Sequence, residues 1–223
     1  MSVGVGVVSA AGIDIPRIGF GTWPMKAELC ANMVREALAA GYRHLDTAQG
    51  YANEVEVGRG LKDSGVKRAD VFITTKIRPD RLRNGDLQRS VENSLRDLGI
   101  EQLDLLLIHW PNPEVPLEET IPALNAVKRD GLTRAIGLSN FTIALLEKAW
   151  ALTREPLAAE QVEFHPFLDQ RKIAAAIKAR GMALIAYSPL ALGGIAKDAT
   201  IKRIADAHGR TPAQVTLRWL LQQ

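Results

Sequence analysis

Short apolar runs alternate along the chain with stretches in which apolar residues recur at helical spacing. The helical stretches commonly end at a glycine, a residue that readily adopts the left-handed conformation that closes a helix. The predicted strands are residues 18–21, 43–47, 71–76, 103–109, 134–138, 158–162 and 183–187, and the predicted helices are residues 27–40, 53–64, 86–98, 118–130, 142–153, 169–180 and 211–223. Seven strand-then-helix units predict a parallel sheet, and closure into a barrel gives every strand two neighbours.

The beginning and the end of the chain depart from this rhythm. Residues 3–17 have the pattern of a β-hairpin, with Gly12 in the turn, and we expect residues 1–17 to cap one end of the barrel. A (β/α)8 TIM barrel has eight strands and about 250 residues, whereas this α/β pattern of 223 residues stops in the helix after the seventh strand. We therefore expect a single barrel domain over residues 1–223, either truncated before the eighth strand or open between the first and seventh strands.

Composition and charge exclude several other classes of protein. The formal net charge of +3 comes from residues spread along the chain, without the run of Lys and Arg that follows a phosphate backbone. Cys30 is the only cysteine, which excludes an internal disulfide and fits a reducing compartment. No apolar run approaches the roughly 20 residues of a membrane span. We expect a soluble, cytoplasmic protein with neither a nucleic-acid nor a membrane partner.

Three of the predicted strands end on polar side chains suited to proton transfer. Asp46, Lys76 and His109 occupy these ends, and Tyr51 follows Asp46 by five residues. Since the active sites of parallel barrels lie at the carboxyl ends of the strands, we expect these side chains to share one pocket. An ammonium group stabilises a neighbouring phenolate, a carboxylate supplies the countercharge, and an imidazole can orient the reacting oxygen. The set suits proton transfer to a carbonyl oxygen that is becoming an alkoxide.

These residues lie within a series of longer motifs that covers essentially the whole chain. The motifs are GFGTW (19–23), GYRHLDTAQGYANE (41–54), ITTKI (73–77), LLIHWP (106–111), IGLSNF (136–141), QVEFHP (161–166), AYSPLA (186–191) and TPAQVTLRWLLQQ (211–223). Together they resemble the aldo-keto reductase family, above all its small bacterial 2,5-diketogluconate reductase type. The resemblance implies a (β/α) barrel in which Tyr51 donates the proton and Asp46, Lys76 and His109 complete a catalytic tetrad.

The same resemblance implies a cofactor, NADPH, bound extended and without a Rossmann domain. The residues that it assigns to the cofactor are Thr22, Ser139, Asn140, Gln161, Tyr187, Ser188 and Leu190. Ser139, Asn140 and Gln161 would hold the nicotinamide carboxamide, because Asn and Gln side chains offer an amide both a donor and an acceptor. Tyr187 would stack on the nicotinamide ring, and the segment after the seventh strand would lie along the pyrophosphate.

The expected substrates are small aldehydes, ketones or keto acids. Trp23 and Trp110 follow two strand ends and would form the apolar walls of the substrate pocket. Arg78 stands where relatives often carry an aromatic residue, and it either favours an acidic substrate or is solvated. In the family, the residues that grip the adenosine 2′-phosphate follow the eighth strand, so the choice of NADPH over NADH rests on the resemblance alone.

Several alternatives stay open beside this hypothesis. A lone Asp or Lys is often half of a structural ion pair, although four matching positions favour catalysis. His44, Asp46, His109 and His165 could be imagined as metal ligands, but the charge of Lys76 repels a metal ion and we expect none. A cofactor-binding interaction protein and an inactive truncated fragment are the alternative functions. The resemblance suggests a monomer.

Overall fold

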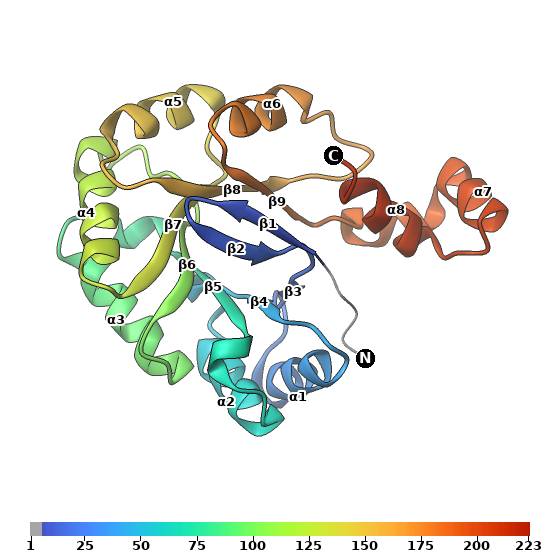
Figure 1. The fold of residues 1–223 in the computed structure, drawn as a ribbon, viewed down its shortest axis with the longest axis horizontal. Coiled ribbons are helices and arrows are strands. Elements are labelled where there is room, and N and C mark those ends of the chain that lie inside the picture. Colours follow the sequence, from blue (N-terminus) through green and yellow to red (C-terminus); the bar gives the residue numbers. More distant parts are fainter. Residues whose placement is uncertain (1–5) are drawn as a thin grey trace.

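The computed structural model describes residues 6–223, so the first residues of the expected hairpin, 3–5, lie outside it. Seven strands form one curled sheet in the order β3-β4-β5-β6-β7-β8-β9, and all neighbouring strands are parallel (Figure 1). They are β3 (Phe20–Gly21), β4 (His44–Asp46), β5 (Phe72–Ile77), β6 (Leu103–Ile108), β7 (Thr133–Ser139), β8 (Leu157–Glu163) and β9 (Ala183–Tyr187). The predicted α/β class with a parallel sheet is confirmed.

Helices join successive strands and cover the outer face of the sheet. The α-helices are α1 (Ala27–Ala39), α2 (Glu54–Ser64), α3 (Asp86–Leu98), α4 (Leu117–Arg129), α5 (Ile143–Leu152), α6 (Arg171–Ala179), α7 (Ala199–Ala207) and α8 (Pro212–Leu220). Among residues 6–223, the 3-10 helices are η1 (Gln49–Tyr51), η2 (Arg68–Asp70), η3 (Pro79–Arg81) and η4 (Ala191–Lys197). The sequence pattern placed no helix between residues 187 and 211, and the presence of α7 corrects that prediction.

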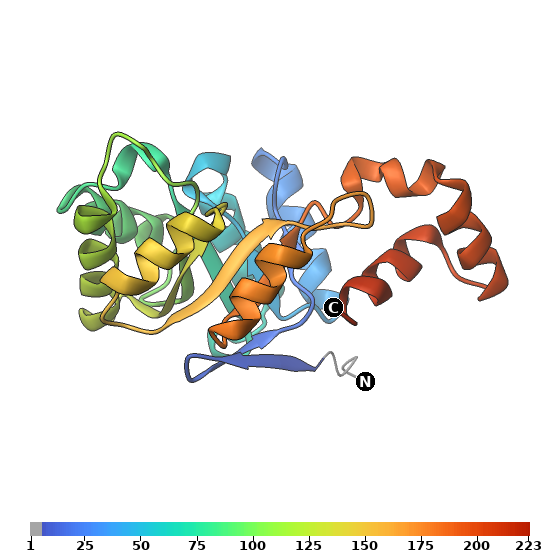
Figure 2. The same ribbon diagram turned by 90° about the horizontal axis from the view of Figure 1, so that it is seen from above.

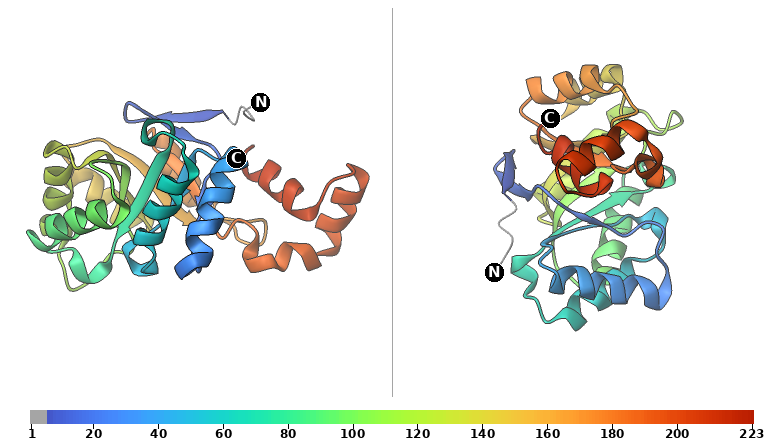
Figure 3. Two further views of the ribbon diagram at one scale, coloured as in Figure 1. Left: turned by 90° about the horizontal axis from the view of Figure 1, so that it is seen from below. Right: turned by 90° about the vertical axis from the view of Figure 1, so that its right-hand side faces the viewer.

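A two-stranded antiparallel hairpin, β1 (Val7–Ala10) and β2 (Ile13–Pro16), lies across one end of the curled sheet (Figures 2 and 3). Gly12 takes a φ of +78° in its turn, as the sequence predicts. Ile13 and Ile15 pack into the inner apolar cluster beside Phe72, the first residue of β5. The hairpin therefore caps the end of the sheet where the strands begin, opposite the strand ends that carry the polar side chains.

The central strands are buried on both faces because they lie between two apolar layers. All six residues of β5 and all six of β6 are buried. Leu106 and Ile108 belong to the outer cluster between sheet and helices, whereas Leu105 and Leu107 belong to the inner one. Parallel strands covered on both sides read as continuous apolar runs, which is why they were visible in the sequence. The two layers give the strand ends a rigid support.

Strands β3 and β9 form the two edges of the sheet, and within residues 6–223 no strand joins them. Helices α7 and α8 lie beyond this side and project from the rest of the molecule (Figure 2). Trp219 of α8 stacks on Phe164, with ring centroids 5.7 Å apart, and so connects the projecting helices to the end of β8. In the described range, no helix combines the length and apolar character needed to cross a membrane.

Candidate active site

The ends of β4, β5 and β6 bring three polar side chains to one place. Asp46 is the last residue of β4, Lys76 lies one residue before the end of β5, and His109 directly follows β6. The Lys76 side chain is fully buried, and its Nζ donates hydrogen bonds to Asp46 Oδ1, to the Thr47 carbonyl at 2.9 Å and to Tyr51 Oη at 3.3 Å. The parallel register thus gathers the four residues of the predicted tetrad.

The buried ammonium of Lys76 is stabilised by the charges around it. Burial alone lowers the pKa of the Lys76 amine, but Asp46 and Tyr51 outweigh burial through their charges and hydrogen bonds, so that the pKa is raised. Lys76 also lies over the Tyr51 ring, 5.0 Å from its centroid. A positively charged amine therefore adjoins the phenol oxygen of Tyr51.

His109 completes this group as a neutral imidazole. Its ring meets the Tyr51 ring edge to face, with centroids 5.5 Å apart. Burial lowers the pKa of His109 to about 4, and the positive charge of Lys76 adds to this effect while Asp46 opposes it. The backbone N–H of His109 donates to the Ile77 carbonyl at 3.1 Å, which holds the residue at the strand end. A neutral ring can donate or accept a hydrogen bond at the reacting oxygen.

The segment that carries Tyr51 is fastened by Asn53, a residue that the sequence analysis did not single out. Asn53 is only 1% exposed. Its Nδ2 donates to the carbonyl oxygens of Thr22 and Met25 at 3.1 and 3.0 Å, and its Oδ1 accepts from Thr47 Oγ1 at 2.8 Å. These bonds join the Tyr51 segment to the chain after β3. The signal in the sequence was its place two residues after Tyr51 in the GYRHLDTAQGYANE motif.

Gln49 fastens the other side of η1. Its Nε2 donates to the Ser90 carbonyl and to Ser94 Oγ, both at 2.9 Å, and its Oε1 accepts from the Arg78 N–H at 3.1 Å. The Arg78 guanidinium itself pairs with Asp80 at 2.9 Å, and both side chains are about half exposed. This position fits the solvated alternative for Arg78 better than a role in binding an acidic substrate.

Asn140 joins the end of β7 to the tetrad. It follows Ser139, the last residue of β7, and has a φ of +64°. Its Nδ2 donates to the His109 carbonyl at 2.9 Å and to Ser139 Oγ at 3.0 Å, and its Oδ1 accepts from Tyr187 Oη at 2.9 Å. Burial raises the pKa of Tyr187, which keeps this hydroxyl a donor. The amide of Asn140 therefore bridges the ends of β6 and β9.

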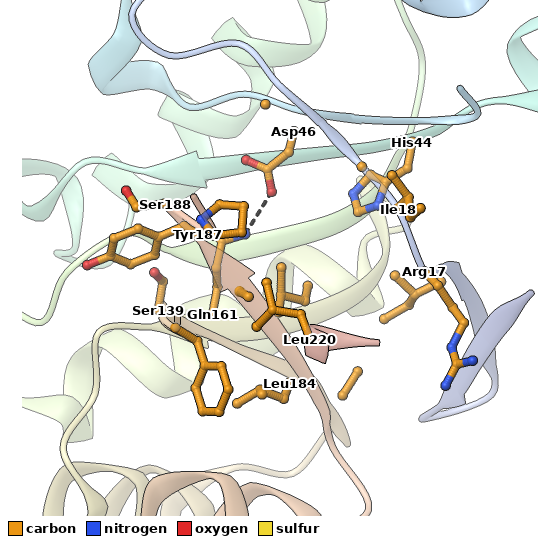
Figure 4. A pocket seen from close by; sticks show the side chains of 18 of the residues that line it. Arg17, Ile18, His44, Asp46, Ser139, Gln161, Leu184, Tyr187, Ser188 and Leu220 are labelled. Atoms are coloured by element: carbon orange, nitrogen blue, oxygen red, sulfur yellow. Dashed lines mark hydrogen bonds between the residues drawn. The ribbon is translucent and has the colours of Figure 1, made fainter. Parts of the chain in front are cut away.

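Gln161 makes a second bridge, from β8 to β4. Its Nε2 donates to Asp46 Oδ2 at 2.7 Å, a bond drawn in Figure 4. Asp46 thus uses one carboxylate oxygen for Lys76 and the other for Gln161. The sequence analysis assigned Gln161 to the nicotinamide and did not foresee this contact with the tetrad.

One large cavity connects these groups. Its volume is about 1390 Å³. The predicted site residues that line it are Thr22, Trp23, Asp46, Tyr51, His109, Trp110, Ser139, Asn140, Gln161, Tyr187, Ser188 and Leu190. Lys76 lies behind the wall and reaches the cavity through Tyr51. Trp23 and Trp110 are 58% and 49% exposed and lie at its rim.

The cavity continues from the tetrad toward the hairpin, where it reaches Arg17 and His44 (Figure 4). The ring of His44 lies inside the curled sheet, beside Thr74 and Phe72. Its Nε2 is 2.9 Å from Thr74 Oγ1, and the ring meets Phe72 edge to face. Burial lowers the pKa of His44. In the described part of the chain, no group of three or more His, Cys, Asp or Glu side chains has an arrangement that could hold a metal ion.

The cavity wall carries polar groups that suit a carboxamide. Within residues 6–223, Gln161 uses one amide N–H for Asp46, so its carbonyl oxygen and its other N–H are available to a ligand. Thr22 Oγ1 is buried at this wall without a hydrogen-bond partner among the described residues. A group with both a donor and an acceptor matches such a wall. The residues present therefore fit the amide end of a nicotinamide.

Comparison with known proteins shows the family. The family model described as the aldo/keto reductase family matches residues 17–223. The chain belongs to the aldo-keto reductase family. Its enzymes reduce carbonyl groups with a nicotinamide cofactor, so the chain is an NAD(P)H-dependent carbonyl reductase by class, and the predicted resemblance is confirmed.

Individual aldo-keto reductases are similar over nearly the whole chain. The methylglyoxal reductase DkgB of Escherichia coli O157:H7 is 46% identical over 210 residues, which are 93% of this chain and 79% of that protein. An aldo-keto reductase of Mycolicibacterium smegmatis is 40% identical and covers 95% of this chain. A crystal structure described provisionally as a 2,5-diketo-D-gluconic acid reductase B has a TM-score of 0.96 at 45% identity, covering 98% of this chain and 78% of its own. The (β/α)8 fold class is thereby supported.

Proposed function

We propose that the protein reduces small aldehydes, ketones or keto acids with NADPH, and that Tyr51 donates the proton. The observation that carries the proposal is the distance of 3.3 Å between Tyr51 Oη and the buried Lys76 Nζ, beside a neutral His109. The similarity to methylglyoxal reductases supports a small dicarbonyl such as methylglyoxal as a substrate.

The reaction adds a hydride to the carbonyl carbon and a proton to the carbonyl oxygen, which gives an alcohol. NADPH, when bound, supplies the hydride. Tyr51 Oη transfers its proton to the oxygen as negative charge develops there, and the ammonium of Lys76 stabilises the phenolate that is left. The neutral ring of His109 holds the carbonyl oxygen by a hydrogen bond. Asp46 keeps the amine of Lys76 charged and aimed at Tyr51.

The cofactor-binding residues are part of this proposal. Ser139, Asn140 and Gln161 would bind the carboxamide of the nicotinamide, and Tyr187 would stack on its ring. Thr22, Ser188 and Leu190 line the same cavity and would contact other parts of NADPH. All of them line the same cavity as Tyr51, which supports this assignment because hydride and proton must reach the same carbonyl group.

The substrate would enter between the two tryptophans at the rim. The indoles of Trp23 and Trp110 would form apolar walls that exclude water from a small carbonyl compound. In this proposal the protein acts as a cytoplasmic monomer on a small molecule and uses no metal ion. The ion pair of Asp46 and Lys76 at the tetrad supports a site without a metal, since it already balances the local charge.

The decisive experiment follows NADPH oxidation with methylglyoxal in wild type, Tyr51→Phe and Tyr42→Phe. Removing one oxygen from Tyr51 should lower kcat by about 10²-fold or more while NADPH still binds. Tyr42 packs against Phe20 and is not among the residues that line the cavity, so Tyr42→Phe should keep the wild-type rate. Equal rates in wild type and Tyr51→Phe would contradict the proposed mechanism.

A further inference from the structure

Glu160 is a fully buried acid at a position where the proposed mechanism needs none. It precedes Gln161 in β8, and successive strand residues point to opposite faces of a sheet. Gln161 faces the cavity, so Glu160 faces the layer between the sheet and the helices. Its register partner on β7, Leu138, belongs to the outer apolar cluster. The carboxyl group therefore lies in apolar surroundings and takes no direct part in the cavity.

The Glu160 carboxyl makes one hydrogen bond. Its Oε1 accepts from the backbone N–H of Phe141 at 2.8 Å, whereas its Oε2 has no hydrogen-bond partner among the described residues. Burial raises the pKa of Glu160 to about 8, although the bond from Phe141 opposes this change. Burying an unpartnered polar atom is unfavourable, and an apolar side chain would fill the same space without that penalty. What Glu160 provides and an apolar side chain does not is an acceptor for the backbone N–H of Phe141.

That contact acts on the backbone of Asn140. Asn140 has a φ of +64°, a left-handed conformation that asparagine adopts more readily than most residues with a Cβ but that remains uncommon outside glycine, so contacts of the neighbouring peptide groups help to hold it. The N–H of Asn140 donates to the Gln161 carbonyl at 3.0 Å, and the next N–H, that of Phe141, donates to Glu160. Two adjacent residues of β8 thus hold the peptide groups on both sides of Asn140.

The orientation of Asn140 matters because its side chain connects three parts of the site. The amide contacts the His109 carbonyl, Ser139 Oγ and Tyr187 Oη. A rotation of the Asn140 backbone would break these bonds together. It would also displace the amide that, under the proposed function, binds the carboxamide of the nicotinamide.

We propose that Glu160 is a positioning residue of the cofactor site, which holds Asn140 in its left-handed conformation through the hydrogen bond from Phe141. The inference rests on the proposed function in that Asn140 binds the nicotinamide. Glu160 touches neither cofactor nor substrate, and its effect is confined to the geometry of the turn after β7.

The test compares Glu160→Met, which removes the acceptor at similar volume, with Glu160→Gln, which keeps an acceptor oxygen. Val162→Ala, on the same face of β8 and in the outer cluster, is the control for lost packing. Titration calorimetry measures the Kd for NADPH, and steady-state kinetics with methylglyoxal separate KM from kcat. We expect Glu160→Met to raise Kd and the KM for NADPH about 10-fold with a smaller change in kcat. Glu160→Gln should stay within about 3-fold of wild type, and Val162→Ala should leave Kd unchanged while lowering the melting temperature.

A second measurement uses the protein without cofactor. Amide hydrogen exchange at Phe141, followed by NMR, should be slow in wild type and in Glu160→Gln and fast in Glu160→Met. Rapid exchange in Glu160→Gln with an unchanged Kd would overturn the inference even if Glu160→Met does not fold. An unchanged Kd in folded Glu160→Met would also overturn it. If wild type neither binds NADPH nor reduces methylglyoxal, the proposed function fails, whereas exchange at Phe141 still decides whether Glu160 holds the turn.

Discussion

At the scale of single residues, the candidate site depends on which side chains carry charge. The buried Lys76 and the partly buried Asp46 form a pair of opposite charges, and His109 beside them is neutral. A second positive charge on His109 would be repelled by Lys76 at close range. The site therefore offers one ammonium, one phenol and one neutral imidazole, a combination that suits proton transfer to a carbonyl oxygen.

The charge state of His109 predicts how the enzyme responds to acid. With a pKa of about 4, well below the usual 6.5, the ring stays neutral as the pH falls through 6.5. We expect kcat/KM for methylglyoxal to stay level from pH 7.5 to about 5.5 and to decline only as the pH approaches the pKa of His109. Rates measured over this range, with His109→Gln as the variant that lacks the ring, test the expectation. A half-loss of activity near pH 6.5 in wild type alone would contradict it.

The buried carboxyl of Glu160 predicts a pH dependence of stability. Its pKa in the folded protein, about 8, lies above the ordinary value of 4.5, so between these values the unfolded chain releases a proton that the folded protein keeps. The contribution of this proton to the free energy of unfolding is fully present below pH 4.5 and is lost as the pH rises through 8. Its size is on the order of a few kcal/mol. Glu160→Gln does not titrate, so its melting temperature should rise relative to wild type between pH 5 and pH 8. The exposed Glu101→Gln is the control, and a constant difference for Glu160→Gln would refute the argument.

The sequence identified the residues at the strand ends but not the contacts among them. Asp46, Lys76 and His109 were predictable because apolar runs ended on them and parallel strands place their ends together. The bond between Gln161 and Asp46 joins residues 115 positions apart, and it depends on the curvature of the sheet and on side-chain rotamers. The role of Glu160 could not be predicted for the same reason, because its hydrogen-bond partner is the backbone N–H of Phe141 in the turn after β7.

At the scale of elements, close helix packing places its own demands on the sequence. A Cβ atom at Gly60 of α2 would lie 2.5 Å from the Ala31 carbonyl oxygen and 2.8 Å from Val34 Cβ, both in α1. Such distances are shorter than van der Waals contact, so only glycine allows α1 and α2 to approach this closely. Helix α1 follows the segment that contains Trp23, and helix α2 follows η1, which contains Tyr51. The contact between the two helices therefore supports both of these segments of the candidate site.

Gly60→Ala should therefore destabilise the protein although alanine favours helices. We expect a loss of about 1–3 kcal/mol in the free energy of unfolding, because the two helices must separate to admit a methyl group. Urea denaturation measures this loss, and Lys62→Ala, at an exposed position of the same helix, should change stability little. A gain in stability for Gly60→Ala would show that α1 and α2 move apart at no cost.

Helix α7 is the α-helix that the sequence pattern did not predict. Asp198 caps this helix by accepting from the Ile201 N–H at 2.8 Å, and Ile201 and Ala205 are buried. An acidic N-cap followed by apolar residues four apart is a helix signal, so α7 could have been predicted from the sequence. The preceding η4 could not have been predicted in this way. Leu192 and Gly193 interrupt it with positive φ values, and the spacing of apolar residues carries no information about these.

At the scale of the whole molecule, the cavity touches both edges of the sheet. Gly21 of β3 and Tyr187 of β9 line it, and within residues 6–223 no strand lies between these edges. A ligand that fills the cavity contacts both edges and so adds interactions between them. Binding and folding stability are therefore linked in this chain.

This linkage predicts a large thermal shift on addition of cofactor. NADPH at about 100 times its Kd should raise the free energy of unfolding by about 2.7 kcal/mol, which corresponds to roughly 5–10 °C in melting temperature. Scanning fluorimetry with an external dye and increasing NADPH measures the shift, and Gln161→Ala should reduce it. A melting curve that does not respond to NADPH would contradict the proposed cofactor site.

The placement of the tryptophans gives the molecule an optical reporter of its own. Trp23 and Trp110 stand at the rim of the cavity in contact with solvent, whereas Trp150 lies on outer helix α5 beside Arg180. Indole emission shifts toward the blue when water leaves the ring, and a reduced nicotinamide nearby accepts its excitation energy. The wavelength and intensity of tryptophan fluorescence should therefore change when a ligand occupies the cavity entrance between Trp23 and Trp110. Stopped-flow fluorescence can then measure the rates of ligand binding and release without an added label.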